Sequence, residues 1–314
     1  MRRPLVAVAI AQIVVSLIGA QQAEGSYLLA RNASKISLKV NRDGIALITY
    51  TAAGRTAHVL AWGAINARHP TRGVPQVKFR IDRSGGWRSF GAGYWRRFRD
   101  ASSPYDGPAL PWFVMARKAP DGSYWALQRW RRMLPNFGVR PRTRIQRAWE
   151  LRLSHWSGPV ALLEMWTDWT AGGAKHHLYG RYTYGGVPVY GFAYSDTHVP
   201  LDGYGRNIYV DSYNSRYGRG WRRVNSKLTY PPNGQFCYTF QRTRSRWGWR
   251  PAGNGRRYRA TVIGPGVTPD AMWKGPGLPR FDPANAAHVQ LEATVNAIGA
   301  SLWSSGPPRY CAGP

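Results

Sequence analysis

Acidic residues are scarce in this chain. Its 314 residues hold 15 aspartates and glutamates against 44 lysines and arginines, which gives a formal net charge of +29. Only seven of the basic residues are lysines, so arginine carries most of the positive charge. Such a surface attracts polyanions in a salt-dependent way. Candidate partners are anionic wall polymers, acidic glycans, anionic lipid and extracellular DNA. The alternative is a charged surface that serves solubility alone.

Long apolar runs are also scarce, and the clearest one lies at the start, between Leu5 and Ile18. It is too short to span a bilayer, which takes about 20 residues. It follows Arg2 and Arg3 and ends at small residues, a pattern typical of a secretory signal with Ala20 as the last residue removed. The alternative is an uncleaved membrane anchor. The sequence predicts a secreted bacterial protein, extracellular or associated with the cell wall, without stable membrane insertion after signal removal.

Cysteine is scarce: the chain has two, Cys237 and Cys311. An isolated pair in an exported protein most simply forms one disulfide. That bond would close a long loop and stabilise the fold by about 4 kcal/mol on the chain-entropy model. Neither cysteine has the closely spaced histidines or cysteines that a metal site or a catalytic thiol would need.

Turn-forming residues are abundant: 35 glycines and 23 prolines separate short runs rich in aromatic and β-branched residues. This pattern predicts a mainly β fold, a sandwich or jelly-roll-like set of antiparallel sheets. A single domain is expected over residues 21–314. The residues from Gly86 to Pro120 are predicted to form a long surface excursion. The clearest predicted strands are Ile36–Val40, Ile45–Thr51, Thr56–Ile65, Val77–Asp82, Ser123–Arg132, Gln146–Trp156, Val160–Trp169, Asn207–Tyr213, Gln235–Phe240 and, last, Arg257–Ile263.

One helix is predicted near the C-terminus, at about 282–303. Asp282 is a suitable cap and Pro283 suits the first helical turn. An apolar stripe at helical spacing follows, formed by Leu291, Val295, Ile298 and Leu302. The predicted disulfide would hold this helix against the strand that contains Cys237.

Carboxylates suited to catalysis are few. Glu150 and Glu164 lie on the two strongest predicted strands, and Asp168 shares a strand face with Glu164. Two carboxylates beside an aromatic residue could hydrolyse a glycosidic bond if they converge in an open groove. The competing interpretation is that Glu150 and Glu164 form structural ion pairs with the abundant arginines.

Aromatic residues recur beside arginines and glycines, and exposed aromatics can stack on sugar faces while arginine binds phosphate or carboxylate. The competing interpretation of each Trp-Arg pair is a buried tryptophan beside a solvated arginine, or an internal cation–π contact. The predicted ligand contacts are Tyr204, Arg206, Trp221, Trp247 and Trp249.

No cofactor and no metal site is predicted. His176 and His177 are neighbours on a predicted strand and should point to opposite faces, so they cannot chelate together. Two sets of residues are weaker candidates for metal ligands. His177, Asp196 and His198 could bind a transition metal, and Asp202, Asn207 and Asp211 could bind calcium.

Taken together, the sequence favours a secreted, non-catalytic protein that binds an anionic or neutral polysaccharide or cell-wall polymer. The first alternative is a β-sandwich glycoside hydrolase that uses Glu164 with Glu150 or Asp168. The second is sequence-independent binding of polyanions or nucleic acid, which predicts affinity that falls steeply with salt.

Overall fold

The fold is described from a computed structural model of the chain. The structure describes residues 25–68, 76–131, 148–170, 172–188, 193–194, 200–201, 208–223, 227–229, 235–240, 243–245, 248–250 and 253–302. The predicted signal at residues 1–20 lies outside these ranges, as does Cys311. Both therefore stay predictions.

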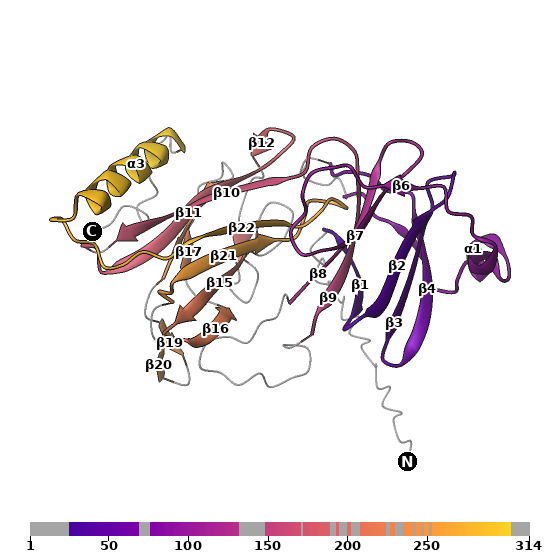
Figure 1. Ribbon diagram of the computed structural model, residues 1–314, viewed down its shortest axis with the longest axis horizontal. Helices are drawn as coiled ribbons and strands as arrows, with labels where there is room; N and C mark the ends of the chain where they lie inside the picture. The colour runs from indigo at the N-terminus through magenta and orange to yellow at the C-terminus, as the bar shows by residue number, and fades with distance from the viewer. Residues whose placement is uncertain are drawn as a thin grey trace, which may run out of the picture.

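The predicted fold class is confirmed: the described chain is mainly β, with antiparallel sheets and one long C-terminal helix. Figure 1 shows the larger sheets in two groups along the long axis of the molecule. The first group is the N-terminal sandwich. One of its sheets has the strand order β1-β9-β8-β7-β6 and the other has the order β2-β3-β4-β5. The strands are β1 (Tyr27–Arg31), β2 (Ser34–Val40), β3 (Ala46–Ala52), β4 (Arg55–Trp62), β5 (Arg80–Asp82), β6 (Ser103–Pro104), β7 (Phe113–Lys118), β8 (Tyr124–Trp130) and β9 (Glu150–Trp156).

The core of the N-terminal sandwich follows from the alternation of apolar residues along its strands. Leu38 and Val40 of β2 face Trp125 and Leu127 of β8 across the core, and all four side chains are buried. The first hairpin of this sandwich consists of β2 and β3. Asn41 accepts hydrogen bonds from the backbone of Asp43 and Ile45, an Asx-type turn that joins β2 to β3.

The second group is the C-terminal sandwich. Its sheets have the orders β10-β11-β18-β17, with β12 paired to β11, and β16-β15-β21-β22. The strands are β10 (Leu162–Thr170), β11 (Lys175–Tyr184), β12 (Val187–Pro188), β15 (Ile208–Ser215), β16 (Gly218–Arg223), β17 (Lys227–Thr229), β18 (Gln235–Thr239), β21 (Arg257–Val262) and β22 (Ala271–Pro276). The shared core holds Leu178, Tyr182, Phe236, Phe240 and Tyr258, all nearly solvent-free.

Two short pairs of strands complete the described β structure. Ala193–Tyr194 (β13) pairs with Pro200–Leu201 (β14), and Thr243–Ser245 (β19) pairs with Gly248–Arg250 (β20). Both pairs are antiparallel hairpins outside the two sandwiches.

The two sandwiches share a buried polar junction around Asp270, which directly precedes β22. The Asp270 carboxyl accepts hydrogen bonds from Trp130 Nε1 at 2.6 Å, from Gly264 N at 3.0 Å and from the Ser26 hydroxyl. Its backbone exchanges two further hydrogen bonds with the side chain of Gln128. Because Trp130 and Gln128 belong to the N-terminal sandwich, this carboxyl joins the two halves of the molecule.

The C-terminal helix is α3 (Ala286–Leu302), and it begins later than predicted. Asn285 accepts hydrogen bonds from the backbone of Ala287 at 3.0 Å and of His288 at 3.4 Å, so Asn285 is the cap. Asp282 instead closes a preceding turn through Ala284 N. The helix packs against β10 and β11 through Val295 and Ile298.

Two strand predictions need correction. The last strand is β22, not Arg257–Ile263, because Gly275 and Pro276 concealed the edge strand that pairs with β21. The residues predicted to form a surface excursion, Gly86–Pro120, also contain sheet structure. Near their end lies β7, which pairs with β8 of the N-terminal sandwich. The rest of the predicted excursion includes the short helices α1 (Trp87–Phe90) and α2 (Tyr94–Arg97), which cover the outer face of β3 and β4. No described helix is long and apolar enough to cross a membrane.

Candidate functional site

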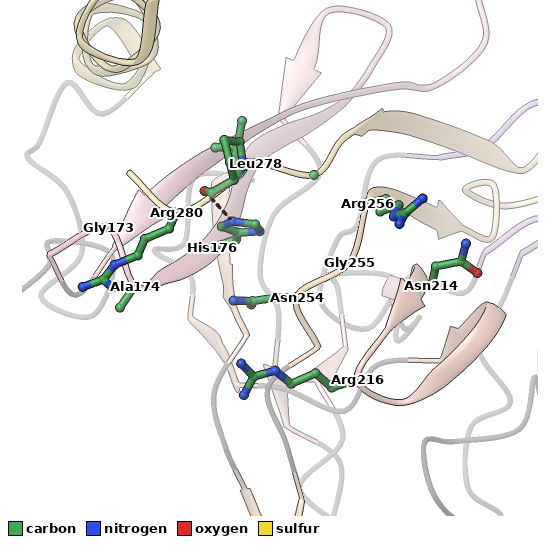
Figure 2. Close-up of a pocket in the computed structure, with 12 residues that line it drawn as sticks. Gly173, Ala174, His176, Asn214, Arg216, Asn254, Gly255, Arg256, Leu278 and Arg280 are labelled. Carbon is green, nitrogen blue, oxygen red and sulfur yellow. Dashed lines mark hydrogen bonds between the residues drawn. The ribbon is translucent and has the colours of Figure 1, made fainter. Parts of the chain in front are cut away.

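A basic pocket opens at the end of the C-terminal sandwich where four turns meet. Its volume is about 800 Å³. Three of its lining residues are arginines, Arg216, Arg256 and Arg280, and none of the described residues that line it is acidic. Figure 2 shows the three arginines on separate segments, with Arg280 to the left of His176, Arg256 to its right and Arg216 below Asn254. All three arginine side chains are exposed and thus available to a ligand.

Glycine makes the wall of this pocket possible. The backbones of Gly255 and Gly277 approach so closely that a Cβ on either residue would collide with its neighbours. Arg256 N donates to Tyr213 O at 2.9 Å, and Gly277 N donates to Arg256 O at 2.8 Å. These hydrogen bonds fix the segment that carries Arg256 against both neighbouring segments, so the backbone of the pocket is preformed.

A hydrogen-bonded chain orients His176 inside the pocket. Gly255 N donates to the Tyr258 hydroxyl at 3.1 Å, and that hydroxyl lies 2.7 Å from His176 Nδ1. His176 Nε2 faces the carbonyl of Pro279 at 3.4 Å, the contact drawn dashed in Figure 2. Burial lowers the pKa of His176 below its usual value, so the imidazole is neutral at pH 7. A neutral imidazole that accepts from Tyr258 donates from Nε2, which matches this chain.

Asn254 supplies an unused acceptor. Its Oδ1 is buried and has no hydrogen-bond partner among the described residues. A buried acceptor without a partner costs free energy until a donor reaches it. The pocket therefore offers guanidinium donors to an anionic group, whereas Asn254 Oδ1 lies buried behind its surface.

The predicted catalytic carboxylates are distributed over two sheets. Glu150 is buried in β9 of the N-terminal sandwich, where Arg31 and Arg152 lie 3.2 and 3.4 Å from its carboxylate oxygens. Glu164 lies on β10, and Arg181 of the neighbouring strand approaches it to 2.5 Å. The interpretation of Glu150 and Glu164 as members of ion pairs is therefore confirmed.

Asp168 shares a face of β10 with Glu164 and Trp166, and α3 lies over part of that face. The Asp168 carboxylate is 3.8 Å from His177 Nε2. Burial, and then the negative charge of Glu292 on α3, raise the pKa of Asp168 to about 6. Burial, followed by repulsion from His176, lowers the pKa of His177 to about 4. This cluster lies beneath a helix and not in an open groove.

Replacing Asp168 with asparagine is expected to stabilise the protein at neutral pH by about 1–2 kcal/mol, less than the full shift because the carboxyl is partly hydrated. The folded chain binds this proton more tightly than the unfolded chain, so Asp168 costs stability as pH rises from about 4 to about 6. Urea unfolding of both proteins from pH 4 to pH 7.5 measures the difference, which should grow with pH. Equal stabilities at every pH would contradict this assignment, and Glu164→Gln is the control on the same face.

The predicted ligand contacts are only partly described. Tyr204, Arg206 and Trp247 lie outside the described residues, and Trp249 is placed by its backbone in β20, opposite Arg244. Trp221 is half-buried in β16 and lies between two arginines, with Arg259 4.3 Å and Arg257 6.0 Å from the ring centre. At Trp221 the recurring aromatic and arginine pattern therefore forms internal cation–π contacts.

The weaker metal sets are also partly described. His176 and His177 point to opposite faces of β11, since one contacts Tyr258 and the other Asp168. Asp211 is buried and holds two arginines, while Asp196, His198, Asp202 and Asn207 lie outside the described residues. Within the described ranges no three histidine, cysteine or acidic residues are placed to hold a metal ion.

One Ser-His contact was not foreseen. The Ser123 hydroxyl is 2.8 Å from His155 Nε2 and 2.6 Å from Asp121 Oδ1. Ser123 is 2% exposed, and His155 stacks on Trp125 with the ring centres 3.9 Å apart. This buried cluster fastens the Asp121–Ser123 turn to β9.

The pocket arginines were also missed by sequence reasoning. Arg256 follows Asn254-Gly255 directly, whereas Arg216 and Arg280 have no glycine or asparagine as immediate neighbours, so the sequence carries no shared signal for the three. They are also far apart in the sequence, and only the pairing of β15 with β16 and β21 brings the first two together.

Fold and pocket define a class: a basic β-sandwich protein with a pocket lined by three arginines. No protein-family model matches the chain, and no curated protein or solved structure is similar enough to match it. The function proposed below therefore rests on the chemistry of its own residues.

Proposed function

We propose that the protein binds an acidic polysaccharide or anionic cell-wall polymer without altering it covalently. The observation that carries this proposal is the pocket with three arginines and no acidic lining residue. Guanidinium groups bind carboxylate and phosphate with paired, charge-assisted hydrogen bonds.

The net charge of the chain supports the same proposal at longer range. A formal charge of +29 raises the encounter rate with any polyanion. Charge alone does not distinguish one polyanion from another, whereas a pocket with fixed walls and one neutral histidine does. Affinity that survives high salt would therefore come from the pocket, because long-range attraction is screened.

The test measures binding of the mature protein to polygalacturonate, poly(glycerol phosphate), neutral dextran and double-stranded DNA from 0.05 to 0.5 M salt. Replacing Arg216, Arg256 and Arg280 together with glutamine should raise the Kd for the preferred acidic polymer roughly 100-fold, at about 1 kcal/mol per lost contact. The matched control replaces Arg42, Arg55 and Arg80, three exposed arginines of the N-terminal sandwich, and removes the same charge.

The two triple variants separate the possible outcomes. A large loss in the pocket variant alone supports the proposal, because both variants carry the same net charge. An equal loss of affinity in both variants, together with binding that disappears at high salt, would leave sequence-independent polyanion binding as the function. Release of shortened sugar chains by the wild-type protein would contradict the non-catalytic part of the proposal.

A further inference from the structure

Helix α1 holds one indole ring out into solvent. Trp87 is 70% exposed, more than any other large hydrophobic side chain that the structure describes. The other clearly exposed tryptophan is Trp149, and its ring has cation–π contacts. Arg129 and Arg131 lie 5.8 and 4.9 Å from its ring centre. Among the described residues, Trp87 has no ring-stacking or cation–π contact of this kind. Its ring faces are therefore available to a ligand.

The support beneath Trp87 is rigid. Asp82 is 3% exposed, and its carboxylate accepts hydrogen bonds from Ser84 N at 2.7 Å and Ser89 N at 3.1 Å, on both sides of Trp87. Gly86 has a positive φ of 93°, and a Cβ there would lie within 2.9 Å of Leu60 and Tyr94. A helix of four residues fixed in this way presents its outward side chain without a large loss of conformational entropy on binding.

The charge around Trp87 is positive. Arg88 of α1 and Arg96 and Arg97 of α2 are exposed, and the two helices are joined by the hydrogen bond from Trp95 N to Gly85 O at 3.2 Å. Three aspartates lie in this region: Asp82 is buried, and Asp100 accepts from Ser102 and from Val40 N. The third, Asp43, accepts from Asn41, which also donates to Tyr94 of α2. An outward ring on α1, which carries Arg88 and is joined to the two arginines of α2, suits a ligand with a flat apolar face and negative charges.

We propose that Trp87 with Arg88, Arg96 and Arg97 forms a second contact for an acidic polysaccharide, so that one protein molecule bridges two strands of the polymer. The proposal rests on the proposed function of the arginine pocket. Sugar rings offer an apolar face to an indole, and their carboxylates or phosphates suit the arginines. We call this surface the Trp87 platform.

The positions of the two sites give bridging its physical basis. Figure 1 shows α1 at one end of the long axis, while the β10–β11 turn that lines the pocket lies toward the opposite end, beside α3. Two sites at opposite ends of the molecule cannot both bind one short fragment, but they can hold two strands. Bridging converts two modest affinities into retention within a polymer network.

The test compares a short probe with a long one. Titration calorimetry with trigalacturonate should give two sites per wild-type protein, and one site each for Trp87→Ala and for the pocket variant. Light scattering with long polygalacturonate should show networks with wild-type protein, while Trp87→Ala should need at least tenfold more protein. Trp149→Ala is the matched control and should behave as wild type.

Each outcome decides between the two proposals. One trigalacturonate site that only the pocket variant removes would overturn the platform and leave the pocket intact. Sites unaffected by the pocket variant but lost in Trp87→Ala would overturn the pocket and, with it, bridging. Binding of Trp87 to anionic phospholipid vesicles in preference to the sugar would overturn the assignment of the ligand. Unfolding curves of Trp87→Ala should match the wild type, since the ring is exposed.

Discussion

Replacing Asp211 with alanine is expected to destabilise the protein by about 3–5 kcal/mol, because it removes a buried carboxylate that pairs with two buried guanidinium groups. Asp211 is 1% exposed, and its two oxygens lie 2.7 Å from Arg223 Nε and 2.8 Å from Arg259 Nη2. Arginine stays protonated in proteins, so the charges cannot be relieved by titration. Burial lowers the pKa of Arg259, and Asp211 opposes that effect.

Asp211 also positions two arginines that contact three aromatic rings, an arrangement we call the cation–π ladder. Arg259 lies 4.3 Å from the ring centre of Trp221 and 4.5 Å from that of Trp112, while Arg223 lies 4.7 Å from that of Tyr209. Because Trp112 comes from the N-terminal sandwich, the cation–π ladder crosses the junction. Loss of Asp211 should therefore disturb both halves of the molecule.

Chemical denaturation measures the effect of Asp211→Ala, with Glu164→Ala as its control. Glu164 also pairs with an arginine, but Arg181 is 46% exposed, so the control should lose less than about 1 kcal/mol. Thermal unfolding should agree, at roughly 2–4 °C per kcal/mol for a domain of 150–250 residues. Similar losses in the two variants would show that burial does not distinguish the two pairs.

These contacts show why the strands were predictable but the role of their side chains was not. Alternating apolar residues and the turn at Asn41 are local, and β2 and β3 follow from them. The contacts of Trp221 are not local. Its neighbours in the sequence are Arg222 and Arg223, yet the guanidinium groups over its ring belong to Arg257 and Arg259. Cross-strand register, which the sequence does not display, decides which arginine meets which ring.

The candidate site illustrates the same limit. The predictions concentrated on carboxylates and tryptophans, because those residue types carry recognisable chemistry. The pocket instead uses arginines that are common throughout the chain. What distinguishes Arg256 is its position between two close backbone approaches, at Gly255 and Gly277. That distinction arises from the folded backbone, so composition and spacing alone do not reveal it.

The surroundings of Cys237 show what holds the C-terminal helix against the sheet. The predicted disulfide would hold the C-terminal helix against the strand of Cys237. The side chain of Cys237 is buried and packs with Tyr179 and with Val295 of α3. Tyr179 also donates a hydrogen bond to Val295 O at 2.7 Å. The helix is therefore already fixed over Cys237 by contacts among the described residues, and the bond to Cys311 stays a prediction.

The second large effect is expected at the junction, where Asp270→Asn should destabilise the protein by about 3–5 kcal/mol. The carboxyl of Asp270 accepts on both oxygens, from Gly264 N and Ser26 on one and from Trp130 Nε1 on the other. Asparagine keeps one of these oxygens and turns an NH₂ group toward donors on the other side. A buried donor and the new NH₂ group then face each other unpaired, which costs about 1–3 kcal/mol for each of these two groups.

Hydrogen exchange distinguishes this effect from a general loss of stability. Because Asp270 joins the sandwiches, Asp270→Asn should speed amide exchange first at the junction, at Gly264 and in β8, before either core opens. Asp211→Ala should instead weaken β15 and β21, the strands that hold its ion pairs. Uniform acceleration across all strands in Asp270→Asn would mean that the two sandwiches unfold as one unit and that the junction has no separate stability.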